Sequence, residues 1–330
     1  MRKYWLAILQ GILSLALIWH LFSSPTLRVE VADVIANAKP HWILLGSMTA
    51  LLTECLCAVR WWFILRLFGT PVSLPRVFAF CGAGLFFSLG LPGAAGGDAF
   101  RIIYVIRLYP RSKLRASLTV LADRLCGLVA LVIAFAVVAI FQHQRFEGDP
   151  HTKVILKAAS FTLGSIVLLV SLWAIFSTWR PAKKIWLPLD PIRKIGDRLG
   201  LVFPKLARNP KLLAAAVFVS FPSLAFHFAT YFFSMRAFNI QIRFSEVFTV
   251  MPIVDTLILL PVTLFGIGLR ETLFEQLLGG LFGVPLGAAT LASLGGFGLQ
   301  ATVALLGGLM IPFTTPPPIL SSQSNKSKNT

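Results

Sequence analysis

Residues 91–101 read LPGAAGGDAFR and separate two strongly apolar segments of the chain. The composition is 56% hydrophobic and only 13% charged, yet this short stretch contains a proline, three glycines, an aspartate and an arginine. Proline and glycine both interrupt regular helices. The stretch is therefore either an ordinary loop or a place where a broken helix holds a charged group.

The apolar segments of the chain are long enough to cross a membrane, which takes roughly 20 mainly apolar residues. The mean hydropathy of +0.79 is far above that of a soluble domain. Windows without Asp, Glu, Lys or Arg cover residues 4–22, 125–142, 158–178 and 212–235, and residues 276–325 carry no charge. The sequence predicts an all-α polytopic membrane protein with about seven to eight membrane segments, the first being a retained helix over 4–22.

The formal net charge of +17 is distributed as membrane topology requires. Nineteen of the 30 Lys and Arg lie in residues 2–3, 60–76, 101–115 and 180–211, whereas six lie in 23–41, 142–153 and 236–243. An excess of Lys and Arg in short loops marks the cytoplasmic face, and these residues attract anionic lipid headgroups. The distribution predicts a cytoplasmic N-terminus, a basic cytoplasmic connector over 180–211 and no nucleic-acid partner.

Residues 77–100 are predicted to dip into the membrane and return to the same side. Residues 101–115 contain five Lys or Arg and no acidic residue, so they belong on the same face as the connector over 63–76. Non-helical backbone at membrane depth requires surrounding protein or a water-filled cavity. The quoted stretch is therefore expected to form part of a broken, re-entrant hairpin.

A similar stretch, LPVTLFGIGLR, occupies residues 260–270. In both stretches Leu-Pro ends an apolar run, glycines follow, an arginine lies nine residues after the proline, and a carboxylate is close by (Asp98 or Glu271). Interrupted segments at matching places in two halves indicate a transporter's binding site. The sequence thus predicts one domain over 1–313 with halves of about 1–179 and 212–313, one broken hairpin in each half, and a disordered tail over 314–330.

Arg101 and Arg270 are the predicted substrate-binding side chains. A guanidinium is a planar, permanently charged fork suited to phosphate, and broken helices expose backbone N–H groups that favour anions. The two arginines are expected to form two half-sites for a phosphate-bearing headgroup in one central cavity. Backbone N–H groups near four glycines would complete these half-sites: Gly96, Gly97, Gly266 and Gly268. Asp98, Asp123 and Glu271 would orient the arginines or meet a cationic headgroup. The alternative is a pair of glycine hinges whose arginines reach the membrane interface.

Further ionisable residues interrupt apolar segments and are expected to be paired or to line a cavity. Asp123 and Arg124 lie near the start of the segment over 115–141, and Asp123 is expected to meet Arg101. That contact would belong to the substrate site or would be a salt bridge that only holds the fold. Both interpretations remain open.

Two carboxylates interrupt apolar segments elsewhere, Glu54 in the second predicted helix and Asp255 within residues 245–270. Either is a candidate to bind a coupling proton, because burial favours the neutral form of a carboxyl group. The alternative is a structural hydrogen-bonding role. His227, in a phenylalanine-rich segment, is expected to pack or to form hydrogen bonds.

Sequence motifs for catalysis or metal binding are missing. The four cysteines (Cys55, Cys57, Cys81 and Cys126) lie in apolar segments and lack the spacing of a redox or zinc motif. The sequence contains no nucleophile elbow, P-loop or His/Glu metal spacing. It therefore predicts neither a catalytic residue nor a metal or other cofactor.

Four elements together carry a resemblance to a known family: Arg60-Trp61, FFSLGLPGAAGGDAFR at 86–101, DRLCGL at 123–128 and PVTLFGIGLRE at 261–271. In this order they resemble the flippase-like membrane domain of the lysylphosphatidylglycerol synthase (multiple peptide resistance factor) family, over nearly the whole chain. The resemblance implies a stand-alone member without the aminoacyl-transfer domain that makes the lipid. One departure is Phe265, where the family often has a glycine pair.

The resemblance implies a lipid translocase of a bacterial or archaeal inner membrane, moving a phospholipid or another lipid phosphate between leaflets. An alternative is a non-transporting partner that recruits a lipid-synthesising enzyme through the basic 180–211 stretch. A third possibility, an enzyme acting on lipid-linked sugars, is disfavoured because the sequence has no paired carboxylates or metal motif.

Overall fold

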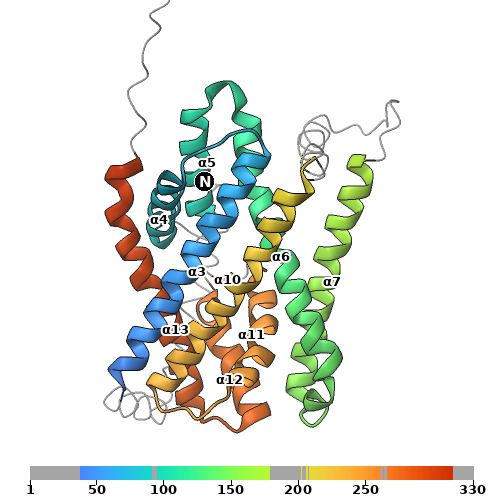
Figure 1. Cartoon of the computed structure of the whole chain (residues 1–330). Coiled ribbons are helices and arrows are strands. Elements are labelled where there is room, and N and C mark those ends of the chain that lie inside the picture. Colours follow the sequence, from blue (N-terminus) through green and yellow to red (C-terminus); the bar gives the residue numbers. More distant parts are fainter. Residues whose placement is uncertain are drawn as a thin grey trace, which may run out of the picture.

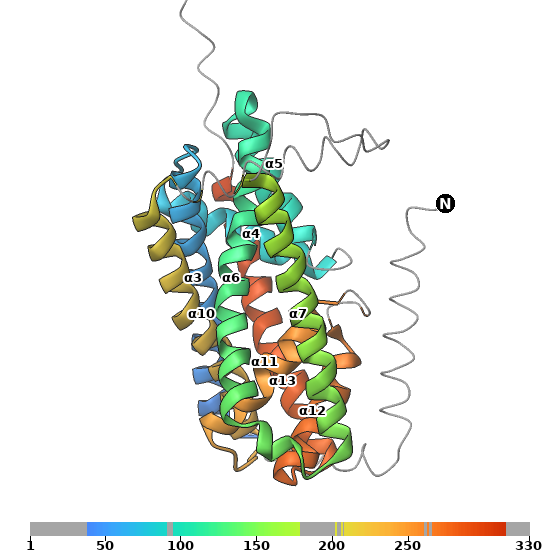
Figure 2. The same cartoon turned by 90° about the vertical axis from the view of Figure 1, so that its right-hand side faces the viewer.

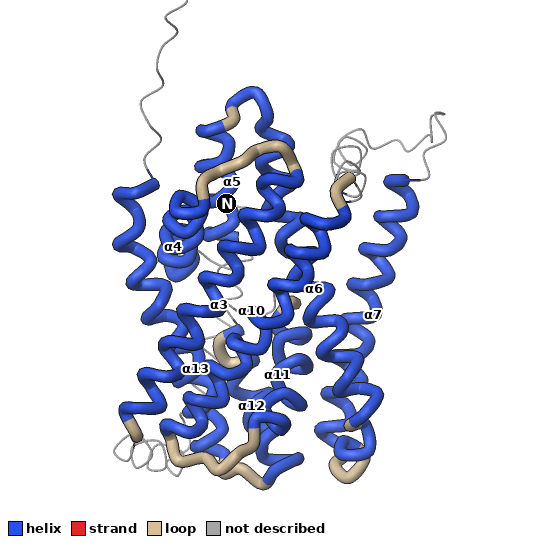
Figure 3. Tube along the Cα trace, viewed as in Figure 1, coloured by secondary structure: helices blue, strands red, loops and turns tan. Residues whose placement is uncertain are grey.

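The computed structural model describes residues 38–90, 95–178, 208–260 and 266–314, together with positions 202, 206 and 263. All regular secondary structure within these residues is helical, which confirms the predicted all-α class (Figure 3). The predicted helix over 4–22, most of the 180–211 connector and the tail after Thr314 lie outside the described residues.

Five segments are long and apolar enough to cross a membrane. Their helices are α3 (Pro40–Leu67), α6 (Lys113–Phe141), α7 (Pro150–Thr178), α10 (Pro210–Ala237) and α13 (Leu286–Gly307). They run roughly alongside one another as a bundle (Figure 1). Large apolar side chains point outward from it, and Phe141, Phe161 and Phe218 are between 74% and 78% exposed. Such a surface suits lipid rather than water, as expected of a polytopic membrane protein.

Two pairs of shorter helices form the predicted broken hairpins. They are α4 (Leu74–Gly90) with α5 (Ala95–Leu108), and α11 (Phe244–Ile258) with α12 (Leu269–Phe282). At 1.5 Å per residue, helices of 14 to 17 residues reach about 21–26 Å, less than the hydrocarbon thickness of about 30 Å. One boundary differs from the prediction. Residues 101–108 form the returning arm of the first hairpin instead of a loop. In the second hairpin, α12 is the returning arm.

The chain from 40 to 141 and the chain from 210 to 307 are two copies of one arrangement. Each has a long helix, a hairpin of two short helices and a second long helix, in that order. Helices α3 and α10 both contain 28 residues and begin at a proline, and Pro210 follows Pro40 by 170 residues. They also end alike, since the next residue but one, Gly69 or Asn239, has a positive φ of 70° or 59°.

The two copies run in opposite directions. The N–H of Lys39, just before α3, donates to the carbonyl of Ala237 at the end of α10 (2.8 Å), so the two helices are antiparallel. They lie side by side in both views (Figures 1 and 2). Further along the seam, the Oγ1 atoms of Thr49 and Thr230 are 3.2 Å apart. Inverted repeats of this kind are a common construction of membrane transporters.

The first hairpin is closed by a contact between glycines. A Cβ atom added at Gly97 of α5 would lie 2.7 Å from the carbonyl oxygen of Gly84 on α4, and it would also strike the Ser88 hydroxyl. Only a residue without a side chain allows this approach. Small residues let membrane helices pack closely in this way, so Gly97 has a packing role in addition to its place in the first turn of α5.

Three short 3-10 turns accompany the helices: η1 (Pro110–Ser112), η2 (His143–Phe146) and, after α13, η4 (Gly308–Thr314). Before α7, the carboxylate of Asp149 accepts a hydrogen bond from the Thr152 N–H (3.0 Å), and this bond holds the pKa of Asp149 below its usual range. The side chain thereby caps the free N–H groups at the start of α7.

Candidate functional site

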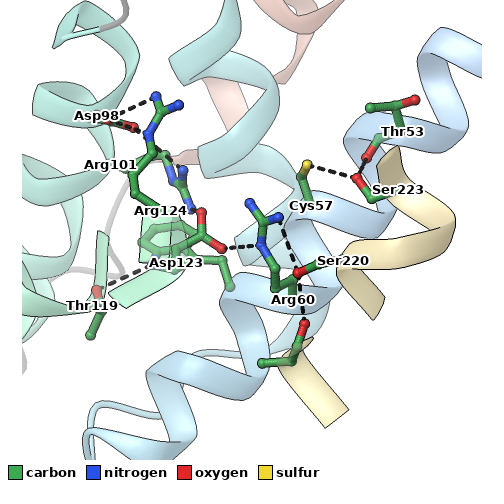
Figure 4. Close-up of polar contacts among 12 residues, drawn as sticks. Thr53, Cys57, Arg60, Asp98, Arg101, Thr119, Asp123, Arg124, Ser220 and Ser223 are labelled. Carbon is green, nitrogen blue, oxygen red and sulfur yellow. Dashed lines mark hydrogen bonds and ion pairs between the residues drawn. The ribbon is translucent and has the colours of Figure 1, made fainter. Parts of the chain in front are cut away.

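A buried ion-pair network joins α3, α5 and α6 (Figure 4). Asp123 lies at its centre with 1% exposure. Its Oδ1 accepts from Arg60 Nε (2.7 Å) and its Oδ2 accepts from Arg101 Nη2 (2.9 Å). The predicted contact between Asp123 and Arg101 is confirmed, and Arg60 is a second partner that the prediction did not include.

The network continues toward the surface through Asp98. Its Oδ1 lies 3.6 Å from Arg101 Nη1, and its Oδ2 lies 2.9 Å from Arg124 Nη2. The Arg124 side chain is 55% exposed and forms the open end of the network. We name the five residues Arg60, Asp98, Arg101, Asp123 and Arg124 the first arginine cluster. With three arginines and two aspartates, it retains one positive charge in excess.

The Trp61 ring packs against the first arginine cluster. The Arg101 guanidinium carbon lies 4.0 Å from the centre of the Trp61 ring, a cation–π contact. The indole N–H donates to Thr119 Oγ1 (3.2 Å), and Trp61 is fully buried. The Arg-Trp pair is typical of a helix end at the membrane interface, but here α3 continues to Leu67. The pair therefore lies inside the protein and belongs to the site.

Arg270, near the start of α12, occupies the matching place in the second copy. Its guanidinium carbon is 5.2 Å from the centre of the Phe297 ring and 6.0 Å from that of Tyr231. Tyr231 follows Trp61 by 170 residues, and Arg270 follows Arg101 by 169. We name Tyr231, Arg270 and Phe297 the second arginine site. Each copy of the repeat thus sets one arginine against the aromatic ring of its long helix.

Glu271 has a structural position beside this site. Its Oε2 accepts from the Gly268 N–H (2.6 Å), its Oε1 accepts from Ser293 Oγ (2.8 Å), and it is 1% exposed. Gly266 and Gly268 have φ values of 74° and 86°, in the left-handed region that favours glycine. The two glycines shape the turn that starts α12, and Glu271 caps it, whereas we expected Glu271 to orient an arginine or meet a headgroup.

A third polar group brings together α10, α11 and α13. His227 Nε2 lies 3.2 Å from Asp255 Oδ2, and His227 Nδ1 lies 3.0 Å from Gln300 Nε2. Both ring nitrogens of His227 therefore have partners, which confirms its expected hydrogen-bonding role. Neither the partnership with Asp255 nor Gln300 itself was predictable from sequence spacing, because the three residues lie 28 and 73 positions apart.

Glu54 lies on α3, is half-buried and is within electrostatic range of His227. Within the described part of the chain, its carboxylate makes no hydrogen bond or ion pair. The basic side chains within electrostatic range of this carboxylate are His227 and three arginines of the first arginine cluster, Arg101, Arg60 and Arg124. We name Glu54, His227, Asp255 and Gln300 the central polar group.

The two arginines lie at different depths. Thr49 on α3 contacts Thr230 on α10, so it marks the level of Tyr231, the ring against Arg270. Trp61, the ring against Arg101, is twelve residues further along α3 than Thr49. At 1.5 Å per residue the separation is about 18 Å along the helix. The rings beneath the two arginines are thus separated along α3, whereas we expected Arg101 and Arg270 to line one central cavity. Glu54, between positions 49 and 61, lies between the two levels.

These features define a polytopic helical membrane protein made of two inverted copies, each with an arginine-bearing broken hairpin. The family model described as "Lysylphosphatidylglycerol synthase TM region" matches residues 7–308, and the chain belongs to this family. A stretch of 124 residues is 26% identical to the UPF0104 membrane protein MJ1595 of Methanocaldococcus jannaschii. That stretch spans 36% of this chain and 37% of the archaeal protein. The resemblance stated from the sequence motifs is confirmed.

Proposed function

We propose that the protein is a lipid translocase that moves a phospholipid or lipid-linked phosphate between leaflets, and that the headgroup visits the two arginine sites in turn. One observation carries the proposal: an inverted repeat sets Arg101 and Arg270 against equivalent aromatic rings about 18 Å apart along α3. In this proposal the phosphate leaves one arginine site for the other as the lipid crosses the bilayer.

The first arginine cluster has the chemistry of an anion site. It carries a positive charge in excess, and its outermost member, Arg124, is exposed. The first turn of α5 contains Gly96 and Gly97, whose N–H groups have no partner within the helix. An arriving phosphate would replace Asp98, whose contact with Arg101 is the longest in the cluster at 3.6 Å.

The second arginine site offers a different environment for the same headgroup. Arg270 lies between the rings of Tyr231 and Phe297, and the N-terminal end of α12 is adjacent, with the favourable end of its dipole. A guanidinium among aromatic rings is weakly hydrated and binds phosphate as a planar fork. The acyl chains of the lipid would remain in the surrounding bilayer.

The charge distribution supports an orientation for this path in a bacterial or archaeal inner membrane. Tyr109, in the loop after the first hairpin, donates through its hydroxyl to the Pro71 carbonyl, so the two connections lie at one end of the molecule. Arg66, Arg76, Arg111, Lys113 and Arg115 surround these connections. We infer that this end is cytoplasmic. The alternative of a recruiting partner depends on the 180–211 stretch, most of which lies outside the described residues.

Leaflet exchange in proteoliposomes tests the proposal. Short-chain fluorescent phosphatidylglycerol and a fluorescent polyprenyl phosphate would be followed by extraction with albumin. Replacing Arg124 or Arg270 by alanine should slow exchange by roughly 10- to 100-fold, the loss expected for charge-assisted hydrogen bonds of about 1.5–3 kcal/mol. The exchange rate of Arg270→Lys should lie between those of the unmodified protein and Arg270→Ala, because lysine keeps the charge but lacks the planar guanidinium.

Arg145→Ala removes an exposed arginine from the η2 turn and is the matched control. It should exchange lipid at the rate of the unmodified protein. Equal exchange by the Arg124→Ala, Arg270→Ala and control proteins, each verified as folded, would overturn the assignment of the sites. Absence of exchange for both lipids in the unmodified protein would overturn the translocase itself.

A further inference from the structure

The central polar group lies where a headgroup would pass between the two arginine sites. Glu54 is five residues beyond Thr49, at the level of the second arginine site, and seven before Trp61, at the level of the first. These intervals correspond to about 8 Å and 10 Å along α3. An anion on this path therefore passes a carboxylate close to the middle of the protein.

Glu54 is surrounded by ionisable side chains, so its charge affects the electrostatic potential along the proposed path. Three helices beside α3 place ionisable side chains near Glu54. These are His227 on α10, Cys81 on α4, and Asp123 and Arg124 on α6. Helix α13, residues 286–307, has no ionisable residue. Arg101 of α5 and Arg60 of α3 add positive charge from the first cluster, and α11 contributes Asp255 through His227. Asp123 and Asp98 are both bound to arginines. Among the described residues, the Glu54 carboxylate forms no ion pair, and it lies along the proposed path.

The partners of His227 allow it to hold or release a proton without losing a hydrogen bond. A neutral imidazole donates from Nε2 to Asp255 and accepts at Nδ1 from the Gln300 amide nitrogen. A protonated imidazole donates from both nitrogens, and a half-turn of the Gln300 amide presents its oxygen to Nδ1 instead. Asp255 is an anionic partner in either state and stabilises the imidazolium.

We propose that Glu54 and the His227–Asp255 pair form a proton-binding site that controls passage of the anionic headgroup. This inference rests on the proposed translocase function. An ionised Glu54 repels a phosphate moving between the arginine sites. Uptake of one proton on a Glu54 carboxylate oxygen removes that repulsion, and a proton on His227 adds attraction. After the anion has passed, the protons return to water, so proton binding and headgroup movement are coupled.

The pH dependence of lipid exchange is the first test. The short-chain fluorescent phosphatidylglycerol assay would be run between pH 5.5 and 8.5, with equal pH on both sides. The unmodified protein should exchange faster as the pH falls, by up to about tenfold per unit, the limit for a single proton. Glu54→Gln mimics the protonated carboxyl and should be fast at high pH, with less than about a twofold remaining dependence. His227→Gln removes a positive charge that favours the ionised form of Glu54, so the profile should shift to higher pH.

Glu147→Gln is the matched control, because Glu147 is an exposed carboxylate in the loop before α7. It should keep the profile of the unmodified protein. A pH-independent rate in the unmodified protein, or one profile shared by the Glu54→Gln and Glu147→Gln proteins, would overturn the coupling while leaving the translocase intact.

A second measurement does not depend on transport. Infrared difference spectroscopy of the full chain in detergent should show a carboxyl C=O band that titrates with pH, is missing in Glu54→Gln and is displaced in His227→Gln. If no such band is lost in Glu54→Gln, the proton site is wrong, whatever the exchange assay gives. If the band is present but no lipid moves, the proton site stands and the proposed translocase function fails.

Discussion

Arg101 and Arg270 hold equivalent positions in the two inverted copies, yet their surroundings are chemically different. Arg101 shares the carboxylate of Asp123 with a second arginine, whereas Arg270 lies between aromatic rings. Helices α6 and α13 begin 173 residues apart, so the counterpart of Asp123 is Gly296. A Cβ atom at Gly296 would strike the Tyr231 ring, so this position has no room for an acidic side chain.

The difference shows which parts of the repeat are constrained and which are free to vary. Both copies keep the hairpin, the arginine and the aromatic ring beneath it. The acidic residue beside the hairpin arginine has a separate use in each copy: Asp98 binds Arg101 and Arg124, while Glu271 caps α12. The two sites should therefore hold a phosphate with different strength, because in the first site Asp98 and Asp123 compete with it for the arginines.

The largest effect should come from Asp123→Asn, which leaves Arg60 and Arg101 without their shared charge. Removing one partner of a buried ion pair costs about 3–5 kcal/mol. The free energy of unfolding, measured by detergent titration in mixed micelles, should fall by that amount. Adding Arg60→Gln to Asp123→Asn should recover part of the loss, since one of the two stranded charges is removed.

An Asp123→Asn protein as stable as the unmodified one would show that the cluster does not hold α3, α5 and α6 together. The two copies would then differ less than their contacts indicate. Glu147→Gln, at an exposed carboxylate, is the control and should leave the free energy of unfolding within about 0.5 kcal/mol.

A smaller effect is expected from Gly97→Ala, which tests the close packing of the first hairpin. The added methyl would lie 2.7 Å from the Gly84 carbonyl oxygen, and overpacking of this kind costs about 1–3 kcal/mol. Gly298→Ala on α13 is the control, because nothing lies within 4 Å of its added methyl. That change should be neutral or stabilise by up to about 1 kcal/mol. Equal stabilities of the two variants in the same titration would contradict the tight α4–α5 contact.

The smallest effects should come from the rings beneath the arginines. Trp61→Phe removes the hydrogen bond to Thr119 (3.2 Å) and weakens a close cation–π contact, and should cost about 1–2 kcal/mol. Tyr231→Phe keeps a ring at 6.0 Å from Arg270 and loses only a hydroxyl, so about 1 kcal/mol or less is expected. Thermal unfolding in detergent would rank them, and the reverse order would show that the second ring matters more than its distance indicates.

Much of the fold and part of the site could be predicted from sequence. Proline, glycine and charge within apolar runs are local signals, so both hairpins and the contact between Asp123 and Arg101 were accessible. The different depths of Arg101 and Arg270 could not be predicted, because two similar stretches of sequence do not reveal that the two copies run in opposite directions. Arg60 was also missed. The apolar residues that follow it, as far as Leu67, were the signal that α3 continues beyond the arginine.

The inversion of the repeat places opposite demands on the charges of equivalent turns during membrane insertion. Basic residues keep a short loop on the cytoplasmic side, so two copies inserted in opposite senses cannot share one charge pattern. The turn from the first hairpin into α6 carries Arg111, Lys113 and Arg115. Its counterpart before α13 is Gly283-Val284-Pro285, without charge, at the other end of the bundle (Figure 1). The second copy, which runs in the opposite direction, thus lacks the basic residues that hold this turn on the cytoplasmic side in the first copy.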